Sequence, residues 1–162
     1  MIIRPLGDGD WQHVYRFFAE IVAAGRTYAY PEGLTSEQAC ALWVEPPPAR
    51  TFVAVDGEGG VVGSAKTGPN RPGRGSHVAT GSFMVDPAHH GRGIGRALAE
   101  HVVEAARADG YRSIQFNAVV ETNTSAVRLW QSLGFEILAT VPEAFDDADH
   151  GLVGLHVMLL RL

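Results

Sequence analysis

A glycine-rich turn at residues 90–96 is the segment of the sequence best suited to bind a ligand. It holds, in order, His90, Gly91, Arg92, Gly93, Ile94, Gly95 and Arg96. An apolar stretch that ends at Asp86-Pro87 precedes it and a helical pattern follows, so the turn joins a strand to a helix. Glycine allows the backbone to approach a ligand closely, and the unsatisfied amides at the start of a helix attract phosphate. Arginines in the turn would add charge-assisted contacts.

Two common phosphate motifs do not match this turn. It lacks the Gly-Lys-Ser/Thr of a P-loop, and its alternating glycines do not have the G-x-G-x-x-G spacing of a dinucleotide site. The strand, turn and helix context favours phosphate binding, and close packing of the helix on the strand is the alternative explanation for the glycines. His89 and His90 lack a third histidine or an acidic partner, so we expect no metal site. Cys40 is the only cysteine and forms no intrachain disulfide.

A second patterned segment runs from residue 123 to residue 135. Asn123 is placed to cap a helix and Gly134 to end it. Apolar residues at helical spacing between them predict an inner helix face. These residues are Ala126, Leu129, Trp130 and Leu133.

Together, the two segments resemble the GCN5-related N-acetyltransferase (GNAT) family. Residues 83–98 are similar to its acetyl-CoA signature, Gln/Arg-x-x-Gly-x-Gly/Ala, with His90 where Gln or Arg is usual. Residues 123–135 are similar to the pattern N-x-x-A-x-x-x-Y-x-x-x-G-F, with Trp130 at the tyrosine position. Residues 66–77 and 117–123 resemble the small-molecule branch of azetidine-2-carboxylate and phosphinothricin acetyltransferases.

The resemblance implies that acetyl-CoA is the co-substrate and that the acceptor is a primary or secondary amine of a small molecule, which attacks the thioester directly. It assigns Phe83, Met84 and Val85 to the pantetheine arm, largely through their backbone groups. The turn at residues 90–96 would hold the pyrophosphate, and Asn123 and Trp130 would complete the cofactor site. The residues implied for substrate binding and catalysis are Asn117, Asn123 and Thr80, the last of which stands where a relative has an asparagine.

Proton transfer has no obvious residue in this sequence. Trp130 replaces the tyrosine that protonates the leaving thiolate in many relatives, and an indole N–H has no useful acidity. We interpret Trp130 as a core aromatic residue. The candidates for the base are His77, Glu121 and a water held by Asn117 and Thr80. A CoA-binding sensor without turnover and a protein or peptide acetyltransferase are therefore the alternative functions.

Hydrophobic periodicity predicts a mixed α/β domain that spans residues 1–162. Strands are expected at residues 2–4, 51–55, 61–66, 77–85, 113–120, 135–141 and 152–160. Helices are expected from Asp8 or Asp10 to residue 22, and at residues 35–43, 91–109 and 123–133. The order β-α-α-β-β-β-α-β-α-β-β predicts a mixed sheet of six to seven strands flanked by about four helices.

Three finer expectations concern single segments. The strand at residues 113–120 should place Ile114, Phe116, Ala118 and Val120 on one face. Residues 68–75 and the acidic stretch 143–150 should be loops. The aromatic residues of the first third either line the acceptor site or cover the sheet; they are Trp11, Tyr28, Tyr30 and Trp43.

The composition limits the kinds of partner. With 46% hydrophobic and 19% charged residues, the chain is expected to fold into a globular domain. A formal charge of −5 argues against nucleic acid as the partner. No apolar run approaches the ~20 residues of a membrane span, and no signal peptide is evident. We therefore expect a cytoplasmic protein with no membrane partner, and a homodimer is left open.

Overall fold

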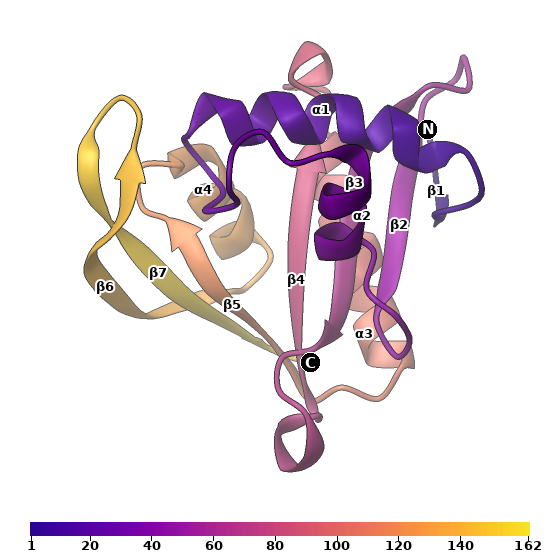
Figure 1. Cartoon of the computed structure of the whole chain (residues 1–162). Coiled ribbons are helices and arrows are strands. Elements are labelled where there is room, and N and C mark those ends of the chain that lie inside the picture. Colours follow the sequence, from indigo (N-terminus) through magenta and orange to yellow (C-terminus); the bar gives the residue numbers. More distant parts are fainter.

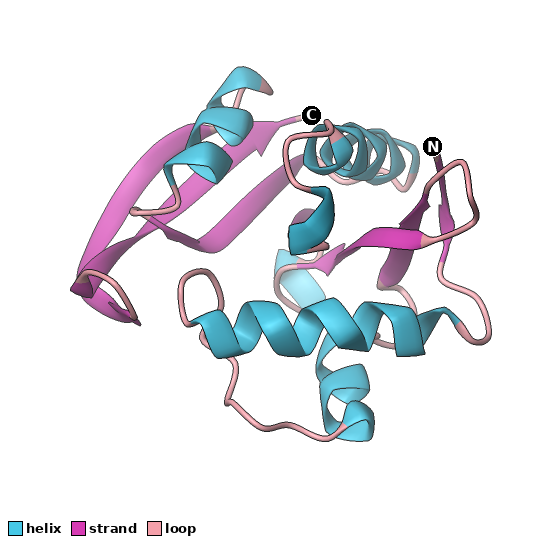
Figure 2. Cartoon of the chain, turned by 90° about the horizontal axis from the view of Figure 1, so that it is seen from above, coloured by secondary structure: helices cyan, strands magenta, loops and turns pink.

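The computed structural model describes residues 1–162 and contains one sheet of seven strands with helices on both faces (Figures 1 and 2). The elements are β1 (Ile2–Pro5), α1 (Asp10–Ala24), α2 (Ser36–Trp43), β2 (Arg50–Val55), β3 (Val61–Pro69), β4 (Val78–Val85), α3 (Ile94–Ala108), β5 (Ser113–Val120), α4 (Thr124–Ser132), β6 (Glu136–Asp147) and β7 (Gly151–Arg161). The predicted α/β class and the predicted element order are confirmed.

The strand order explains where the sheet can open. The sequence of neighbours is β1-β2-β3-β4-β5-β7-β6, and only the central β4–β5 pair is parallel. That pair is joined in register only at Val78–Ser113 and Ala79–Ile114. Beyond these residues β4 and β5 diverge, so the sheet splits into two halves that share one end (Figure 1). Helix α3 connects the two strands as a crossover.

Helices cover both faces of the sheet in pairs. Helices α1 and α2 lie on one side, and α3 and α4 lie on the other (Figure 2). Successive side chains of strand β2 point to opposite faces of the sheet. Val53 therefore packs with α1 and α2, whereas Phe52 and Ala54 pack with α3. Trp130 of α4 packs with Ala99 of α3 in the same core cluster, which joins the two helices of that layer.

Local capping confirms one predicted helix start and corrects another. Thr35 and Gln38 form the predicted capping box of α2, with the Gln38 amide 3.2 Å from Thr35 Oγ1. The prediction that Asp8 or Asp10 caps α1 is wrong. Gly9 is the N-cap residue and has a φ of 87°. The carboxylate of Asp10 instead accepts hydrogen bonds from Arg4 at 3.0 Å and from the Gly7 amide at 2.8 Å.

Two further predicted boundaries differ from the structure. Helix α3 begins at Ile94 rather than at residue 91, because Gly91 and Gly93 have φ angles of 76° and 77°, outside the helical region. Strand β5 contains an irregularity between Phe116 and Val119. This irregularity shifts the alternation, so Val119 is buried and Ala118 is exposed, contrary to the predicted face.

The acidic stretch is largely strand rather than loop. Residues 143–147 belong to β6, and Phe145 and Asp147 pair with Val153 and Gly151 of β7. Both side chains point inward and are buried. The Asp147 carboxylate accepts hydrogen bonds from the Thr122 hydroxyl at 2.5 Å and from the Asp149 amide at 2.8 Å, which satisfies a charge that a loop was expected to expose. Strand β3 likewise extends to Pro69, into the predicted loop. No helix has the length and apolarity needed to cross a membrane.

Candidate active site

The divergence of β4 and β5 opens a cleft of about 1150 Å³ through the middle of the sheet. Thirteen of the fourteen predicted site residues line it, and these are Thr80, Phe83, Met84, Val85, His90, Gly91, Gly93, Ile94, Gly95, Arg96, Asn117, Asn123 and Trp130. Arg92 is not among the lining residues and is exposed. The residues selected from separate sequence motifs therefore meet around one cavity.

The glycine turn forms one end of this cleft. Gly91 and Gly93 both have positive φ, and a Cβ added at either position would meet no atom within 4 Å. These glycines are needed for the backbone conformation and leave open space above it. Gly95 lies in the first turn of α3, and a Cβ there would be 3.7 Å from Val85 and Leu129, an ordinary contact distance. The N-cap residue of α3 is Gly93, which has no side chain that could bond to the first amides of the helix.

A buried carboxylate fixes the strand side of this turn. Asp86 accepts a hydrogen bond from the Ala88 amide at 3.0 Å and lies 2.6 Å from the guanidinium of Arg16 on α1. His89 Nδ1 is 3.4 Å from the same carboxylate. The turn is thus anchored to the helix layer on the opposite side of the sheet from α3. On the cleft side, Arg96 donates to Ser132 of α4 at 2.8 Å, which ties α3 to α4.

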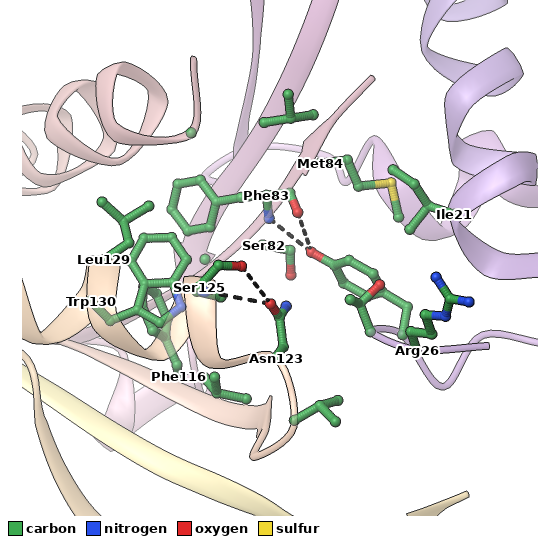
Figure 3. A pocket seen from close by; sticks show the side chains of 18 of the residues that line it. Ile21, Arg26, Ser82, Phe83, Met84, Phe116, Asn123, Ser125, Leu129 and Trp130 are labelled. Atoms are coloured by element: carbon green, nitrogen blue, oxygen red, sulfur yellow. Dashed lines mark hydrogen bonds between the residues drawn. The ribbon is translucent and has the colours of Figure 1, made fainter. Parts of the chain in front are cut away.

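The backbone of β4 faces the cleft at Phe83 and Val85. The Tyr28 hydroxyl accepts a hydrogen bond from the Phe83 amide at 2.9 Å and donates to the Phe83 carbonyl at 2.7 Å (Figure 3). The Val85 carbonyl lies 3.3 Å from His90 Nε2. Burial raises the pKa of Tyr28 well above the usual value of tyrosine, so the hydroxyl stays protonated at neutral pH. Sequence reasoning placed Tyr28 only as a lining or covering residue, because nothing local links it to a residue 55 positions away.

Asn123 and Trp130 line the cleft from α4 and its N-cap. Asn123 caps α4 as predicted, because its Oδ1 accepts from the Ala126 amide at 3.4 Å and from the Ser125 hydroxyl at 3.1 Å. Its amide nitrogen makes no hydrogen bond within the chain and lies beside the cleft (Figure 3). Trp130 is 7% exposed, and its ring centroid lies 4.8 Å from those of Phe83 and Phe116. It is a core aromatic residue with one side facing the cleft.

The candidates for proton chemistry separate into two groups. Asn117 and Thr80 line the cleft, and the Asn117 side chain is fixed by Asn70 at 2.6 Å and by Gln115 at 2.9 Å. His77 and Glu121 do not line the cleft. The Glu121 carboxylate instead accepts a hydrogen bond from the Gly154 amide of β7. Of the three proposed bases, only a water held near Asn117 and Thr80 has its holders in the cleft.

The end of the cleft away from the glycine turn is bridged by the loop after α1. Arg26 lies 2.7 Å from Asp149, and the Ala148 amide donates to the Gly25 carbonyl at 2.9 Å, which joins this loop to the β6–β7 turn. Lys66 and Glu45 also line the cleft and form an ion pair. The charged lining of the cleft is therefore assembled from segments distant in sequence. No group of three or more His, Cys, Asp or Glu side chains is arranged to hold a metal ion.

The comparisons with known proteins agree with this geometry. A family model described as the Acetyltransferase (GNAT) family matches residues 12–135. The chain belongs to the GNAT family. Its fold is similar to that of a GCN5-related N-acetyltransferase from Kribbella flavida, with a TM-score of 0.96, 57% identity, and coverage of 99% of this chain and 97% of that one. The family predicted from the two motifs is confirmed.

Two further relatives are similar to this chain over most of its length. The structure of yncA from Salmonella typhimurium with its cofactor acetyl-CoA has a TM-score of 0.84 and 25% identity, covering all of this chain and 94% of that one. The L-methionine sulfoximine/L-methionine sulfone acetyltransferase of Pseudomonas paraeruginosa is 30% identical over 149 residues, which are 87% of this chain and 83% of the relative.

The match to other curated relatives is shorter. N-acetyltransferase aca1 of Schizosaccharomyces pombe is 36% identical over 99 residues, which are 61% of this chain and 47% of the relative. The Salmonella typhimurium L-methionine sulfoximine/L-methionine sulfone acetyltransferase is matched over 54% of its length. The chain thus spans about half the length of these curated relatives.

Proposed function

We propose that this GNAT chain is an acetyl-CoA-dependent N-acetyltransferase that acts on a primary or secondary amine of a small molecule. One observation carries the proposal: the turn from Gly91 to Gly95 opens onto a cleft that β4 and β5 create by diverging. A ligand bound by phosphate groups at the turn can therefore extend between the two strands toward the polar end near Lys66.

The residues present fit acetyl-CoA. The open space above Gly91 and Gly93 lets a pyrophosphate approach the first amides of α3. The cleft, at about 1150 Å³, exceeds the ~300–1,000 Å³ of ordinary small-molecule pockets, as an elongated ligand requires. The edge of β4 that faces the cleft offers backbone groups at Val85 to the amides of the pantetheine arm, whereas the Phe83 amide and carbonyl are already bonded to the Tyr28 hydroxyl. A direct contact from the Phe83 backbone to the arm stays a prediction. A phosphate contact from the exposed Arg92 stays a prediction.

Bound acetyl-CoA would supply an acyl group at the thioester, and the chain's residues would position it. The Asn123 amide nitrogen, which has no partner in the chain, would donate to the thioester or the pantetheine arm. Asn117 and Thr80 would orient the acceptor amine or a water that removes its proton. The amine must be neutral to attack, so acetylation should accelerate as pH rises toward the pKa of the acceptor.

The class of acceptor is supported by the relatives and by the cleft. Two of the relatives are named as acetyltransferases of L-methionine sulfoximine and L-methionine sulfone, which are amino acids. The cleft is lined by charges of both signs, Arg26 and Lys66 on the positive side and Glu20 and Glu45 on the negative side. A zwitterionic small molecule would find partners there for both its carboxylate and its ammonium group.

Calorimetry with acetyl-CoA, followed by thiol release over an amine panel, tests the proposal. The panel should contain L-methionine sulfone, other amino acids, polyamines and a peptide amine. Gly93→Glu places a carboxylate at the turn and should abolish acetyl-CoA binding. Gly59→Glu is the matched control, because Gly59 also has positive φ and open surroundings but lies in the β2–β3 turn. Binding without turnover on any amine would favour the CoA-binding sensor, and absence of binding would refute both functions.

A further inference from the structure

The Tyr28 hydroxyl is the direct link between the acceptor loop and the cofactor wall. It accepts from the Phe83 amide at 2.9 Å and donates to the Phe83 carbonyl at 2.7 Å. Tyr28 belongs to the loop between α1 and α2, and Phe83 lies midway along the splayed part of β4. Both residues line the cleft. The hydroxyl therefore lies in the cleft against the edge of β4, two residues before Val85, at which the strand ends.

Neighbouring aromatic rings fix the direction of this hydroxyl. The Tyr28 ring stacks on Tyr30 with a centroid distance of 5.4 Å and an interplanar angle of 6°. It also meets Trp43 edge-on, at 6.0 Å and 78°. Trp43 is fully buried, and its indole N–H donates to Ser64 at 2.9 Å. Because these contacts hold the ring in place, a ligand entering the cleft meets a preorganised donor.

The electronic state of the hydroxyl suits a donor rather than a base. Burial raises its pKa, so the O–H remains intact at neutral pH. The hydrogen bond from the Phe83 amide polarises the oxygen and strengthens donation from its proton. That proton can rotate about the C–O bond from the Phe83 carbonyl to another acceptor in the cleft, while the oxygen keeps the bond from the Phe83 amide.

We propose that Tyr28 is a catalytic residue, whose O–H donates to the thioester carbonyl oxygen and stabilises the negative charge that develops there during acyl transfer. This inference rests on the proposed function. The Asn123 amide nitrogen faces the cleft from the opposite wall, so the oxygen would have donors on both sides (Figure 3). The oxygen and the ring are already held in place, so only the hydroxyl proton has to turn from the Phe83 carbonyl to the thioester oxygen when the ligand binds.

The step balances without proton transfer from Tyr28. The amine nitrogen forms a bond to the thioester carbon, and the carbonyl electron pair moves onto oxygen. When that pair returns, the carbon–sulfur bond breaks and CoA leaves as a thiolate. The amine proton passes through water to the thiolate, so the products are the amide and the free thiol. This route needs no acidic side chain at Trp130.

Tyr28→Phe tests the role, with Tyr15→Phe as the matched control. The Tyr15 hydroxyl also donates to a backbone carbonyl, that of Leu34 at 2.8 Å, but Tyr15 does not line the cleft. With the best acceptor from the amine panel, Tyr28→Phe should lower kcat by about 10²-fold or more. The dissociation constant of acetyl-CoA should change by less than about threefold in both variants, and kcat should be retained in Tyr15→Phe.

A fluorinated tyrosine at position 28 gives a second readout that keeps the ring contacts. It makes the phenol proton a stronger hydrogen-bond donor, so kcat at neutral pH should be retained or should rise. Wild-type kcat in Tyr28→Phe would overturn the proposal and leave Tyr28 a structural role. Tighter binding of acetyl-CoA to Tyr28→Phe with unchanged kcat would also overturn it, because Tyr28 would then only occupy the ligand's place. Absence of turnover in the wild-type chain would refute the proposed function itself.

Discussion

Two glycines of the turn, Gly93 and Gly95, differ in their backbone conformation, so alanine should affect the protein differently at the two positions. At Gly93 the φ of 77° places an alanine in the left-handed region, which costs about 1–2 kcal/mol. At Gly95 the backbone is helical, the new Cβ would lie at an ordinary 3.7 Å from Val85 and Leu129, and alanine is favoured over glycine by up to about 1 kcal/mol. The free energies of unfolding of Gly93→Ala and Gly95→Ala should therefore differ by about 2 kcal/mol.

For a chain of this size, such a difference corresponds to roughly 4–8 °C in melting temperature. Urea denaturation and thermal scans of both variants measure it directly. Calorimetry should show acetyl-CoA affinity reduced at least about tenfold in Gly93→Ala, because the methyl group enters the space above the turn, and nearly unchanged in Gly95→Ala. Equal stability and equal affinity of the two variants would refute the reasoning. The family signature, which allows Gly or Ala at the second position and only Gly at the first, follows from this geometry.

Five more substitutions, at four positions, probe the supports of the fold and of the site. Asp86→Ala should lower the free energy of unfolding by about 1–3 kcal/mol, measured by urea denaturation. Arg16→Ala should lower it by less than about 1 kcal/mol, because the Arg16 guanidinium is largely exposed. Equal losses in the two variants would contradict this prediction. Asn123→Asp should keep the helix cap and the free energy of unfolding but lose acetyltransferase activity. Asn123→Ala should lose activity and also about 1 kcal/mol of the free energy of unfolding. A fully active Asn123→Asp would exclude a donor role for the Asn123 amide. Hydrogen bonds from Thr122 and the Asp149 amide hold the pKa of Asp147 below its unfolded value, so its stabilisation is present above pH ~4 and is lost as pH falls. Urea titrations between pH 3 and 6 should show a shallower acid loss in Asp147→Asn.

Features governed by local chemistry could be predicted from the sequence. The capping box at Thr35, the cap at Asn123 and the glycine turn each depend on residues within a few positions of one another. The resemblance to the GNAT family supplied the predicted site residues, and thirteen of these fourteen residues line one cleft.

Features governed by distant partners could not be predicted. Asp147 lies in a strand because Thr122 and the turn amides satisfy its carboxylate, and an isolated acidic stretch gives no sign of such partners. The irregularity in β5 exchanges the exposure of Ala118 and Val119, although the sequence alternates regularly. The pairing of Tyr28 with Phe83 joins two segments that only the tertiary fold brings together.

Because the pairing of β4 with β5 ends early, each of these two strands has an edge in the interior of the protein that no neighbouring strand covers. Free edges normally invite strands from other molecules, and proteins protect them with charges, prolines or covering segments. Here each edge faces the other across a gap, and helices enclose the gap on both sides of the sheet (Figure 2). A ligand that carries amides can complete the hydrogen-bond ladder that the chain leaves unfinished. Binding should therefore slow amide exchange at Val85 of β4, as the addition of a strand would, whereas the Phe83 amide is already bonded to Tyr28.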